Sequence, residues 1–491
     1  MRLFLLLLIS LIAVFPGPLS AQKSDRGCGT VPERNEWLVA FQQNPAAFPR
    51  SPKTLYVPLA VHIVGTDDGK GYLQAYRVLD AFCTLNQDYE AANIQFYLSG
   101  TFHYINSSKY FEHDYNKGIE MMQAYNRPDA VNCYIVGDPA GNCGYAFYTL
   151  GIALDKSCLS ETEHTWAHEL GHYFSLPHTF YGWEGYDFDY SQAAPATVNG
   201  RPVELADGSN CAYAGDGFCD TPADYLNFRW SCQGNGLSPQ QQKDPAGRTF
   251  RSDGTLLMSY AMGDCANRFS DSQIDALRAN LEGPRSALLN DDAPLPPLGS
   301  PPARPINPEQ DQLITNVSSL SLEWPPVPNA EGYIVQLNLL SPLGEETPFM
   351  YYQTEEPGIE IDGLLSERSW RWRVRPYNSY ESCAGFSEAF SFDTGNFISN
   401  TKEQASLSEF RVHPNPLSSG ASMKVEFELP YAFNLQLTLY TSAGVPARRQ
   451  LLDAHYGHNE ATLNTTGLPA GLYWLGIEHT GGRKFQKIIV Q

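Results

Sequence analysis

The sequence predicts an α+β domain with a mixed sheet and one histidine-bearing helix, followed by two all-β sandwich domains. Three observations predict this arrangement. The chain has 491 residues, too many for one ordinary hydrophobic core. A helix-compatible segment with closely spaced histidines, 164-HTWAHELGHYFSLPH-178, lies in the first half. Beyond a proline-dense stretch, the rest of the chain consists of alternating or apolar runs separated by turn residues, which is the pattern of β-strands.

The composition and the N-terminus indicate globular domains in an exported protein. Hydrophobic residues make up 42% and charged residues 18%, which fits packed domains rather than disorder. The net charge of −21 argues against nucleic acid as a partner, because phosphate backbones bind Lys/Arg clusters. Residues 1–21 read as a secretory signal peptide, with an apolar run and a small-residue cleavage site. A membrane anchor is the weaker alternative, because Pro16, Gly17 and Pro18 cut the run short, and no later stretch predicts stable membrane insertion.

Proline-rich and polar joints divide the mature chain. We expect a pro-segment over residues 22–53, because the basic stretch 49-PRSPKT-54 is a candidate processing site, and a first domain over residues 54–290. The stretch 291–308 is predicted to be a semi-rigid linker. Two all-β domains are expected at residues 309–396 and 408–491.

The segment 309–396 has the length and strand pattern of a β-sandwich. It resembles a fibronectin type III domain, with Trp324 and Tyr333 as the expected core aromatics. A carbohydrate-binding role for these aromatics is the alternative, although large aromatic side chains are more often packed in a core.

The segment 408–491 begins with an HPNP motif, contains the strand LPAGLYWL and ends in a lysine-containing terminus. These features resemble the C-terminal sorting domains of the type IX secretion system. The resemblance implies that this domain contacts the outer-membrane secretion machinery and takes no part in chemistry. Together with the signal peptide, it predicts a secreted or cell-surface protein.

The histidine segment is predicted to form a helix with two metal ligands. Ser160 with Glu163 three residues on is a capping-box pattern, so a helix is expected from residue 161. His168 and His172 lie four residues apart and project from the same face. This HExxH spacing presents two nitrogen ligands to one zinc ion.

Three further residues of this segment extend the prediction. Glu169 is placed as the general base for water. His178 cannot reach the same metal from within the helix, because six residues correspond to ~600° of rotation. Pro177 predicts that the chain leaves the helix first. Surface or satisfied core histidines are the alternative interpretation, and His164, which no glutamate follows, is interpreted as a flanking polar residue.

The sequence HELGHYFSLPH resembles the extended zinc motif of the metzincin metalloproteases, in which a turn brings the third histidine round to the metal. Ser175 stands where that family usually has glycine, because the turn takes a left-handed conformation, and a serine there costs about 1 kcal/mol. Four more segments narrow the resemblance to the pappalysin (cytophagalysin) group over roughly residues 54–285: 85-LNQDYEAANIQFYLSG-100, 144-GYAF-147, 216-DGFCDTPAD-224 and 256-LLMSYAMGDC-265.

The resemblance implies the roles of individual residues. The implied zinc ligands are His168, His172 and His178. Glu169 would be the general base, Tyr260 would help to stabilise the oxyanion, and Met258 would form the Met-turn, an apolar floor under the metal. Calcium is suggested near three residues, with a solvated acidic loop as the alternative: Asp216, Asp220 and Thr221.

Ten cysteines in an exported chain predict disulfides. Eight of them lie between residues 83 and 265: Cys83, Cys133, Cys143, Cys158, Cys211, Cys219, Cys232 and Cys265. Cys28 and Cys383 are separate from this set. The four cysteines between residues 211 and 265 are expected to form two bridges beside the cleft. Among their three pairings, we expect Cys211–Cys232 with Cys219–Cys265.

Cys28 lies in 26-RGCGTVP-32, which resembles the cysteine switch of metzincin zymogens. In that device a pro-segment thiolate takes the fourth zinc position. Cutting near Arg50 or Lys53 would release it. With Cys28 on zinc and Cys383 set aside, eight cysteines remain for four bridges. The alternative is that Cys28 pairs with Cys83 or another half-cystine.

The resulting prediction is a secreted zinc endopeptidase that hydrolyses extracellular proteins through an activated water and a glutamate base. The alternative of a different class is an adhesin or matrix-binding protein that retains a decayed protease domain as a scaffold. Ser175 is the feature that favours the alternative.

Overall fold

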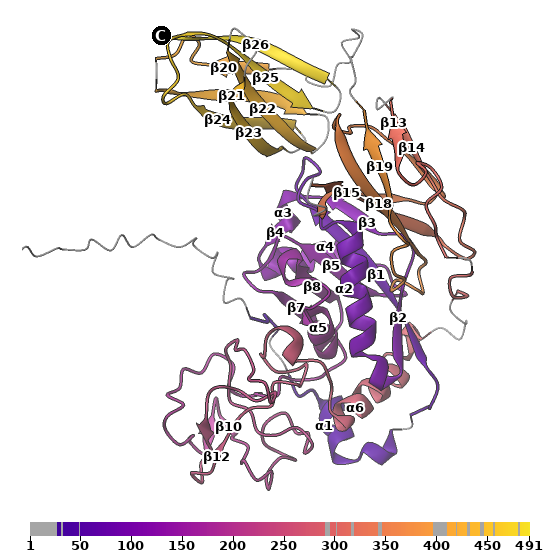
Figure 1. Ribbon diagram of the computed structural model, residues 1–491. Coiled ribbons are helices and arrows are strands. Elements are labelled where there is room, and N and C mark those ends of the chain that lie inside the picture. The colour runs from indigo at the N-terminus through magenta and orange to yellow at the C-terminus, as the bar shows by residue number, and fades with distance from the viewer. Residues whose placement is uncertain are drawn as a thin grey trace, which may run out of the picture.

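The computed structural model (Figure 1) describes residues 27–30, 33–48, 50–289, 295–300, 302–315, 319–341, 346–395, 410–418, 420–429, 433–441, 446–454, 457–479 and 482–491. The predicted signal peptide and the start of the pro-segment lie outside these residues. Within them the chain forms a mixed α/β domain with few helices, followed by two regions of β-sandwich-like sheets. The coarse order of the predicted fold class is confirmed.

The first domain is built on a mixed sheet with strand order β2-β1-β5-β8-β7, and β3 also pairs with β1. The pairs along this sheet are parallel, except that β7 runs antiparallel to β8. Strand β5 is buried along its whole length, as expected for a parallel strand covered on both faces. The strands are β1 (Leu55–Gly65), β2 (Ile94–Leu98), β3 (His103–Asn106), β5 (Val131–Val136), β7 (Gly144–Phe147) and β8 (Gly151–Asp155), with β4 (Glu112–His113) and β6 (Asp138–Pro139) paired separately.

The helices pack around this sheet and share its core. Helix α2 is amphipathic and buries Val78, Leu79 and Phe82 completely. Ser270 and Gln273 form a capping box at the start of α6. The helices are α1 (Glu36–Gln43), α2 (Ala75–Asp88), α3 (Ser108–Phe111), α4 (Tyr115–Tyr125), α5 (Thr165–Tyr173) and α6 (Asp271–Glu282).

Helix α1 belongs to the predicted pro-segment, yet it packs into the core of the first domain. Leu38 and Phe41 are 0% and 1% exposed and lie in the same hydrophobic cluster as the strands of the main sheet. Asn35 caps the helix by accepting a hydrogen bond from the Leu38 N–H at 2.9 Å. The part of the predicted pro-segment that forms α1 is therefore packed into the core of the first domain.

Between α5 and α6 the chain is rich in loops and contains two short hairpins beside α1 (Figure 1). Their strands are β9 (Thr197–Val198), β10 (Arg201–Pro202), β11 (Gln242–Lys243) and β12 (Thr249–Phe250). A separate aromatic cluster organises these loops, in which the buried rings of Trp183 and Tyr225 stack at 4.5 Å.

The second domain consists of two packed sheets. One has the order β13-β19-β18-β15-β16, and the other pairs β14 with β17. Trp324 and Tyr333 are each 3% exposed and their rings lie 5.3 Å apart, so the predicted core role of both is confirmed. The strands are β13 (Gln312–Ile314), β14 (Leu320–Glu323), β15 (Gly332–Leu340), β16 (Glu346–Thr354), β17 (Gly358–Ile361), β18 (Arg368–Tyr377) and β19 (Phe390–Thr394).

This second domain is joined to the first by a disulfide and by side-chain contacts. Cys83 in α2 is bonded to Cys383, 300 residues later. At the start of the same helix, the rings of Tyr76 and Tyr351 stack at 3.7 Å. Setting Cys383 aside as unpaired was wrong, because the packing of the two domains brings it against α2.

The third domain contains a three-stranded sheet, β20-β21-β24, and a four-stranded sheet, β23-β22-β25-β26, around one hydrophobic cluster. The strands are β20 (Phe410–His413), β21 (Ser422–Leu429), β22 (Phe433–Thr441), β23 (Pro446–Ala454), β24 (Gly457–Asn464), β25 (Gly471–His479) and β26 (Gly482–Val490). Among the helices that the structure describes, none is both long and apolar enough to cross a membrane.

Candidate metal centre and cleft

Helix α5 carries the HExxH residues. It begins at Thr165 rather than at residue 161, so the prediction of capping by Ser160 is wrong. The helix cap is His164, whose Nδ1 lies 2.9 Å from both carboxylate oxygens of Asp88 in α2. The side chain of His164 is therefore held by α2 and makes no capping hydrogen bond to α5. His164 thus has a structural partner, in keeping with its interpretation as a flanking polar residue.

Directly after α5 the chain turns and returns His178 to the other histidines. Ser175 takes the left-handed conformation expected at this turn, with φ of 79°. Its N–H donates to the His172 carbonyl at 2.9 Å. Its hydroxyl lies 3.1 and 3.2 Å from the side-chain amide nitrogens of Asn35 and Asn280, which donate to it. These two hydrogen bonds offset the cost of a serine at positive φ.

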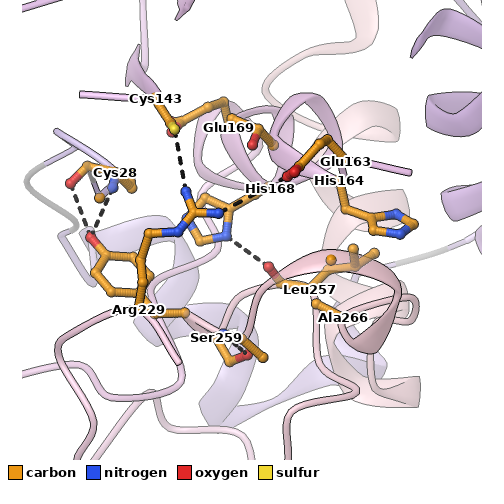
Figure 2. Close-up of a pocket in the computed structure, with 15 residues that line it drawn as sticks. Cys28, Cys143, Glu163, His164, His168, Glu169, Arg229, Leu257, Ser259 and Ala266 are labelled. Carbon is orange, nitrogen blue, oxygen red and sulfur yellow. Dashed lines mark hydrogen bonds and ion pairs between the residues drawn. The ribbon is translucent and has the colours of Figure 1, made fainter. Parts of the chain in front are cut away.

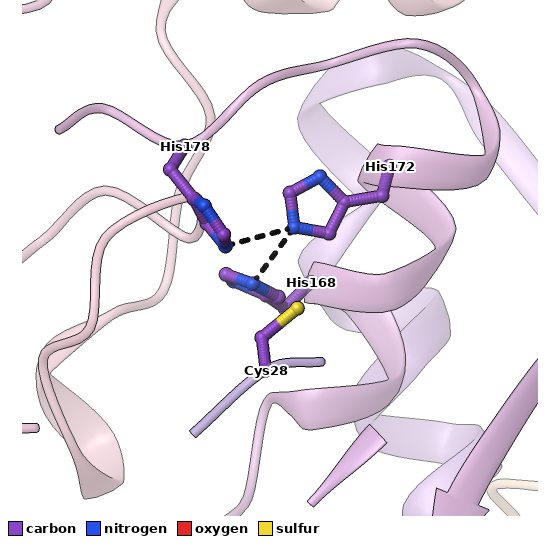
Figure 3. Close-up of side chains that lie close together, drawn as sticks. All are labelled: Cys28, His168, His172 and His178. Carbon is purple, nitrogen blue, oxygen red and sulfur yellow. Dashed lines mark hydrogen bonds between the residues drawn. The ribbon is translucent and has the colours of Figure 1, made fainter. Parts of the chain in front are cut away.

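The three histidines direct one nitrogen each toward a common point (Figure 3). Nε2 of His172 lies 3.1 Å from Nε2 of His168 and 3.1 Å from Nε2 of His178. Two ligands ~2.05 Å from a tetrahedral zinc ion are about 3.3 Å apart. The spacing of the three nitrogens therefore fits a zinc site.

The protons on these imidazoles support the same conclusion. Nδ1 of His168 and of His172 each lie 2.7 Å from a backbone carbonyl oxygen, and Nδ1 of His178 lies 3.2 Å from the Glu184 carboxylate. Because these partners only accept, each Nδ1 carries the proton and each Nε2 presents a lone pair. Three lone pairs at this separation repel one another unless a cation lies between them. The donor set therefore fits a metal ion and does not fit hydrogen bonds between the imidazoles.

Cys28 lies against the same point (Figure 3). Its Sγ and one nitrogen of each histidine lie within 4.8 Å of one another. The segment around it runs along the edge strand β7. The Gly29 N–H donates to the Gly144 carbonyl at 2.8 Å, and the Cys143 N–H donates to the Gly27 carbonyl at 2.9 Å. Cys28 forms no disulfide, so the alternative of pairing with Cys83 is not found.

Glu169 is completely buried next to the histidines. Its Oε2 accepts a hydrogen bond from the Thr30 hydroxyl at 2.9 Å, while its Oε1 is buried with no hydrogen-bond partner among the described residues. Burial raises the pKa of Glu169 to about 7. A β-carbon on Gly144 would lie 2.8 Å from Glu169 Cγ, so glycine at that position makes room for the carboxylate. Oε1 of Glu169 is therefore available as a hydrogen-bond acceptor inside the cleft.

Met258 and Tyr260 lie on a separate segment that contacts α5 and the histidines. Met258 is fully buried, and a β-carbon on Gly171 of α5 would lie 2.5 Å from its sulfur. The Tyr260 hydroxyl donates to the Cys28 carbonyl at 2.9 Å and accepts from the Cys28 N–H at 3.2 Å. The Tyr260 ring lies 5.0 Å from that of His178. Tyr260 is thus beside the site but bonded to the segment that covers it.

The residues predicted for calcium have protein partners. The Asp216 carboxylate accepts hydrogen bonds from the Phe218 N–H and the Thr221 hydroxyl at 2.9 Å. Burial raises the pKa of Asp216 to about 7. Asp220 instead accepts from the Ser270 hydroxyl at 2.9 Å, at the start of α6. The two carboxylates thus serve different local structures, and a calcium role for these residues stays a prediction.

The disulfide pairing differs from the one expected. Cys211 pairs with Cys219, only eight residues away, and Cys232 pairs with Cys265. The second bridge follows from the adjacent pairing of Trp230 with Ala261, which brings the two loops together. The remaining bridges are Cys83–Cys383 and Cys143–Cys158, and Cys133, buried in β5, is not bonded.

The cleft extends beyond the histidines into a cavity of about 50 Å³ (Figure 2). Its charged lining includes Arg229, whose Nη1 lies 3.2 Å from Cys143 Sγ and whose Nη2 lies 4.0 Å from the Glu163 carboxylate. Sequence reasoning missed Arg229, and it also missed Thr30 and Glu184. Thr30 lies within the segment quoted for Cys28, but nothing in that segment indicates a contact with Glu169, and Arg229 and Glu184 are single polar residues outside any quoted motif.

Comparisons with known proteins find two kinds of similarity. Residues 411–491 match the family of secretion system C-terminal sorting domains. "Extracellular metalloprotease 1" of Coccidioides posadasii is 24% identical over 296 residues, which cover 54% of this chain and 93% of that protein. An extracellular metalloprotease of Neurospora crassa is 28% identical over 169 residues, covering 30% of this chain and 58% of that protein. An extracellular metalloprotease of Colletotrichum graminicola is 24% identical over 244 residues, covering 45% and 74% respectively.

Solved structures similar to part of the chain include fibronectin domains. The fn3 domain of human collagen alpha-1(XX) chain is 23% identical, with 23% of this chain and 100% of that chain covered and a TM-score of 0.16. The FN1–FN3 domains of chicken CNTN1 are 14% identical, with 41% and 70% covered and a TM-score of 0.17.

The sequence matches show that the chain is similar to extracellular metalloproteases over about half its length and that residues 411–491 match a sorting domain. It is a secreted or cell-surface protein.

Proposed function

We propose that this protein is a secreted zinc-dependent endopeptidase, with a catalytic domain of the metzincin class and the pappalysin group. One observation carries the proposal: three buried Nε2 lone pairs converge beside a buried glutamate with one unpartnered oxygen. The similarity to extracellular metalloproteases supports it independently. The domain limits in this proposal are those expected from the sequence, with residues 54–290 as the catalytic unit.

The chain's own residues would divide the chemistry between them. His168, His172 and His178 would hold zinc, which when bound supplies a Lewis acid that polarises a carbonyl and acidifies water. Glu169 accepts the proton of the attacking water and delivers it to the leaving amine. Tyr260, once separated from Cys28, would donate a hydrogen bond from its hydroxyl to the developing oxyanion and keep its proton.

Strand β7 would supply the surface that aligns the substrate. It is the last strand of the main sheet, and residues 27–30 pair with it along its outer edge. An extended peptide can add to an exposed strand edge through main-chain hydrogen bonds, which do not depend on side-chain identity. Substrates are therefore extended segments of proteins, and they compete with residues 27–30 for the same edge.

The same contacts would keep the enzyme latent. Cys28 would be the fourth ligand in the latent form, while Thr30 occupies one oxygen of Glu169 and Cys28 occupies Tyr260. Residues 28–30 would thus occupy the fourth ligand position, one oxygen of Glu169 and the hydroxyl of Tyr260. Calcium near Asp216 and Thr221 would serve a structural purpose in the loop beside the cleft.

Peptide hydrolysis tests the proposal. Protein cut at residues 50–53 and freed of its N-terminal segment should cleave members of a quenched peptide library. The Glu169→Gln form should cleave none of them, and the Glu161→Gln form, which changes an exposed acid before α5, should match the parent. If the freed parent cleaves nothing while it holds zinc, the adhesin alternative becomes the better account.

A further inference from the structure

Among the residues that the structure describes, Glu184 is the one side chain that faces an Nδ1 atom of the three histidines. Nδ1 of His168 lies 2.7 Å from the Leu257 carbonyl, and Nδ1 of His172 lies 2.7 Å from the Leu176 carbonyl. Nδ1 of His178 faces a carboxylate oxygen of Glu184 at 3.2 Å. One of the three imidazoles therefore depends on a side chain for its orientation.

His178 needs such a partner more than the other two. His168 and His172 are fixed by helix α5, whereas His178 lies on the loop after it. Its side chain is completely buried and stacks on Phe180 at 4.4 Å. The stack fixes the plane of the ring but not which nitrogen carries the proton. Without an acceptor at Nδ1, the proton could move to Nε2 and remove the lone pair that faces the cluster.

The position of Glu184 is itself fixed by a tight turn. Its second carboxylate oxygen accepts a hydrogen bond from the Gly182 N–H at 2.7 Å, where φ is 99°. The adjacent Trp183 is 2% exposed, and its carbonyl accepts from the Asn227 side chain at 2.5 Å. Asn199 donates to the carbonyls of Gly182 and Glu184 at 3.0 and 3.1 Å. These hydrogen bonds hold residues 182–184 and so fix the direction from which the Glu184 carboxylate faces His178.

We propose that Glu184 is a positioning residue for the third metal ligand. It holds the proton of His178 on Nδ1, so that Nε2 presents its lone pair. It also adds a negative charge beside Nδ1 of this neutral histidine. Partners of this kind orient a ligand and increase its basicity. The inference rests on the proposed zinc function. It concerns a residue that does not itself touch the metal.

Zinc binding separates this role from a purely structural one. Zinc affinity would be measured by competition with a chromophoric chelator, in the full chain and in a Cys28→Ala background that removes the thiol. Glu184→Gln keeps an oxygen acceptor without the charge and should weaken zinc binding by about 10-fold, while Glu184→Ala should weaken it by about 10- to 100-fold. Asp187→Asn removes an exposed carboxylate three residues further on and should leave the affinity unchanged.

A second pair of measurements distinguishes a changed metal site from misfolding of the variants. The visible spectrum of the cobalt-substituted protein reports the ligand field, and thermal unfolding of the metal-free protein reports the fold. A changed cobalt spectrum with an unchanged melting temperature supports the positioning role. Equal zinc affinity and identical cobalt spectra in all Glu184 variants would overturn the inference and leave the proposed function intact. If the parent itself takes up no zinc, the proposed function falls and the inference falls with it.

Discussion

Cutting the chain at residues 50–53 should not by itself activate the protein. Leu38 and Phe41 of α1 are 0% and 1% exposed inside the core of the first domain, upstream of the cut. Replacing a buried leucine by alanine costs about 2–5 kcal/mol, and replacing a buried phenylalanine costs about 3–5 kcal/mol. After the cut, these side chains still bind the N-terminal segment to the core. Residues 27–30 therefore stay on β7 until the segment dissociates.

The magnitude follows from these energies. Each 1.4 kcal/mol corresponds to about tenfold in affinity, so Leu38→Ala should raise the dissociation constant of the cut segment about 30-fold to a few thousand-fold. Phe41→Ala should have an effect of similar size. Gln43→Ala, at an exposed position of the same helix, should have almost none.

The assay places a recognition sequence for a site-specific protease at residues 50–53 and follows hydrolysis of a quenched peptide after the cut. The parent should remain inactive at micromolar concentration and gain activity slowly on dilution. The Leu38→Ala and Phe41→Ala proteins should gain activity at higher concentration and faster. Full activity of the parent immediately after the cut would refute this reasoning, because it would mean that α1 adds no affinity.

Two other predictions concern stability. Ser175→Gly relieves a backbone strain of about 1 kcal/mol but loses the hydrogen bonds from Asn35 and Asn280. Because these effects oppose each other, its melting temperature should stay within a few degrees of that of the parent. Ser175→Val keeps the strain and loses the hydrogen bonds, so its free energy of unfolding should fall by about 2 kcal/mol or more. A valine variant as stable as the parent in thermal unfolding would contradict the geometry of this turn. His62 is buried between His103 and Asn132, and burial lowers its pKa to about 4. Since its folded pKa lies below the unfolded value of about 6.5, the protein should lose up to about 3 kcal/mol of stability as the pH falls from 6.5 to 4. Denaturant unfolding of His62→Gln should show a weaker loss over this range, and an identical pH profile would argue against the assignment.

The parts of the site that were predictable from the sequence depend on local spacing. His168 and His172 share a helix face because of the helical repeat, and Pro177 indicates that the chain leaves the helix before His178, which it does after Tyr173. The left-handed conformation at Ser175 was expected only through a resemblance, and the structure has it. The core positions of Trp324 and Tyr333 were likewise expected through a resemblance, in this case to a fibronectin type III domain, and both side chains are buried.

The parts that were not predictable depend on contacts distant in the sequence. The capping pattern at Ser160 is local, but α5 begins after His164, whose side chain is held by Asp88 of α2. The partner of Cys83 lies 300 residues away and is set by domain packing. The burial of α1 was hidden because its segment was interpreted as a removable extension. Thr30 and Glu184 act through side-chain hydrogen bonds, to Glu169 and His178 respectively, that no spacing rule reveals.

The most direct test of the central claim is the zinc content of the purified chain, measured together with that of two variants. The account predicts about one zinc ion per chain in the parent, retention of that zinc in the hydrolytically inactive Glu169→Gln protein, and its loss when His178→Ala is combined with Cys28→Ala, which leaves only two ligands of the cluster. Unchanged zinc content in this double variant, or a parent that binds no zinc, would contradict the claim that the third histidine completes a metal site.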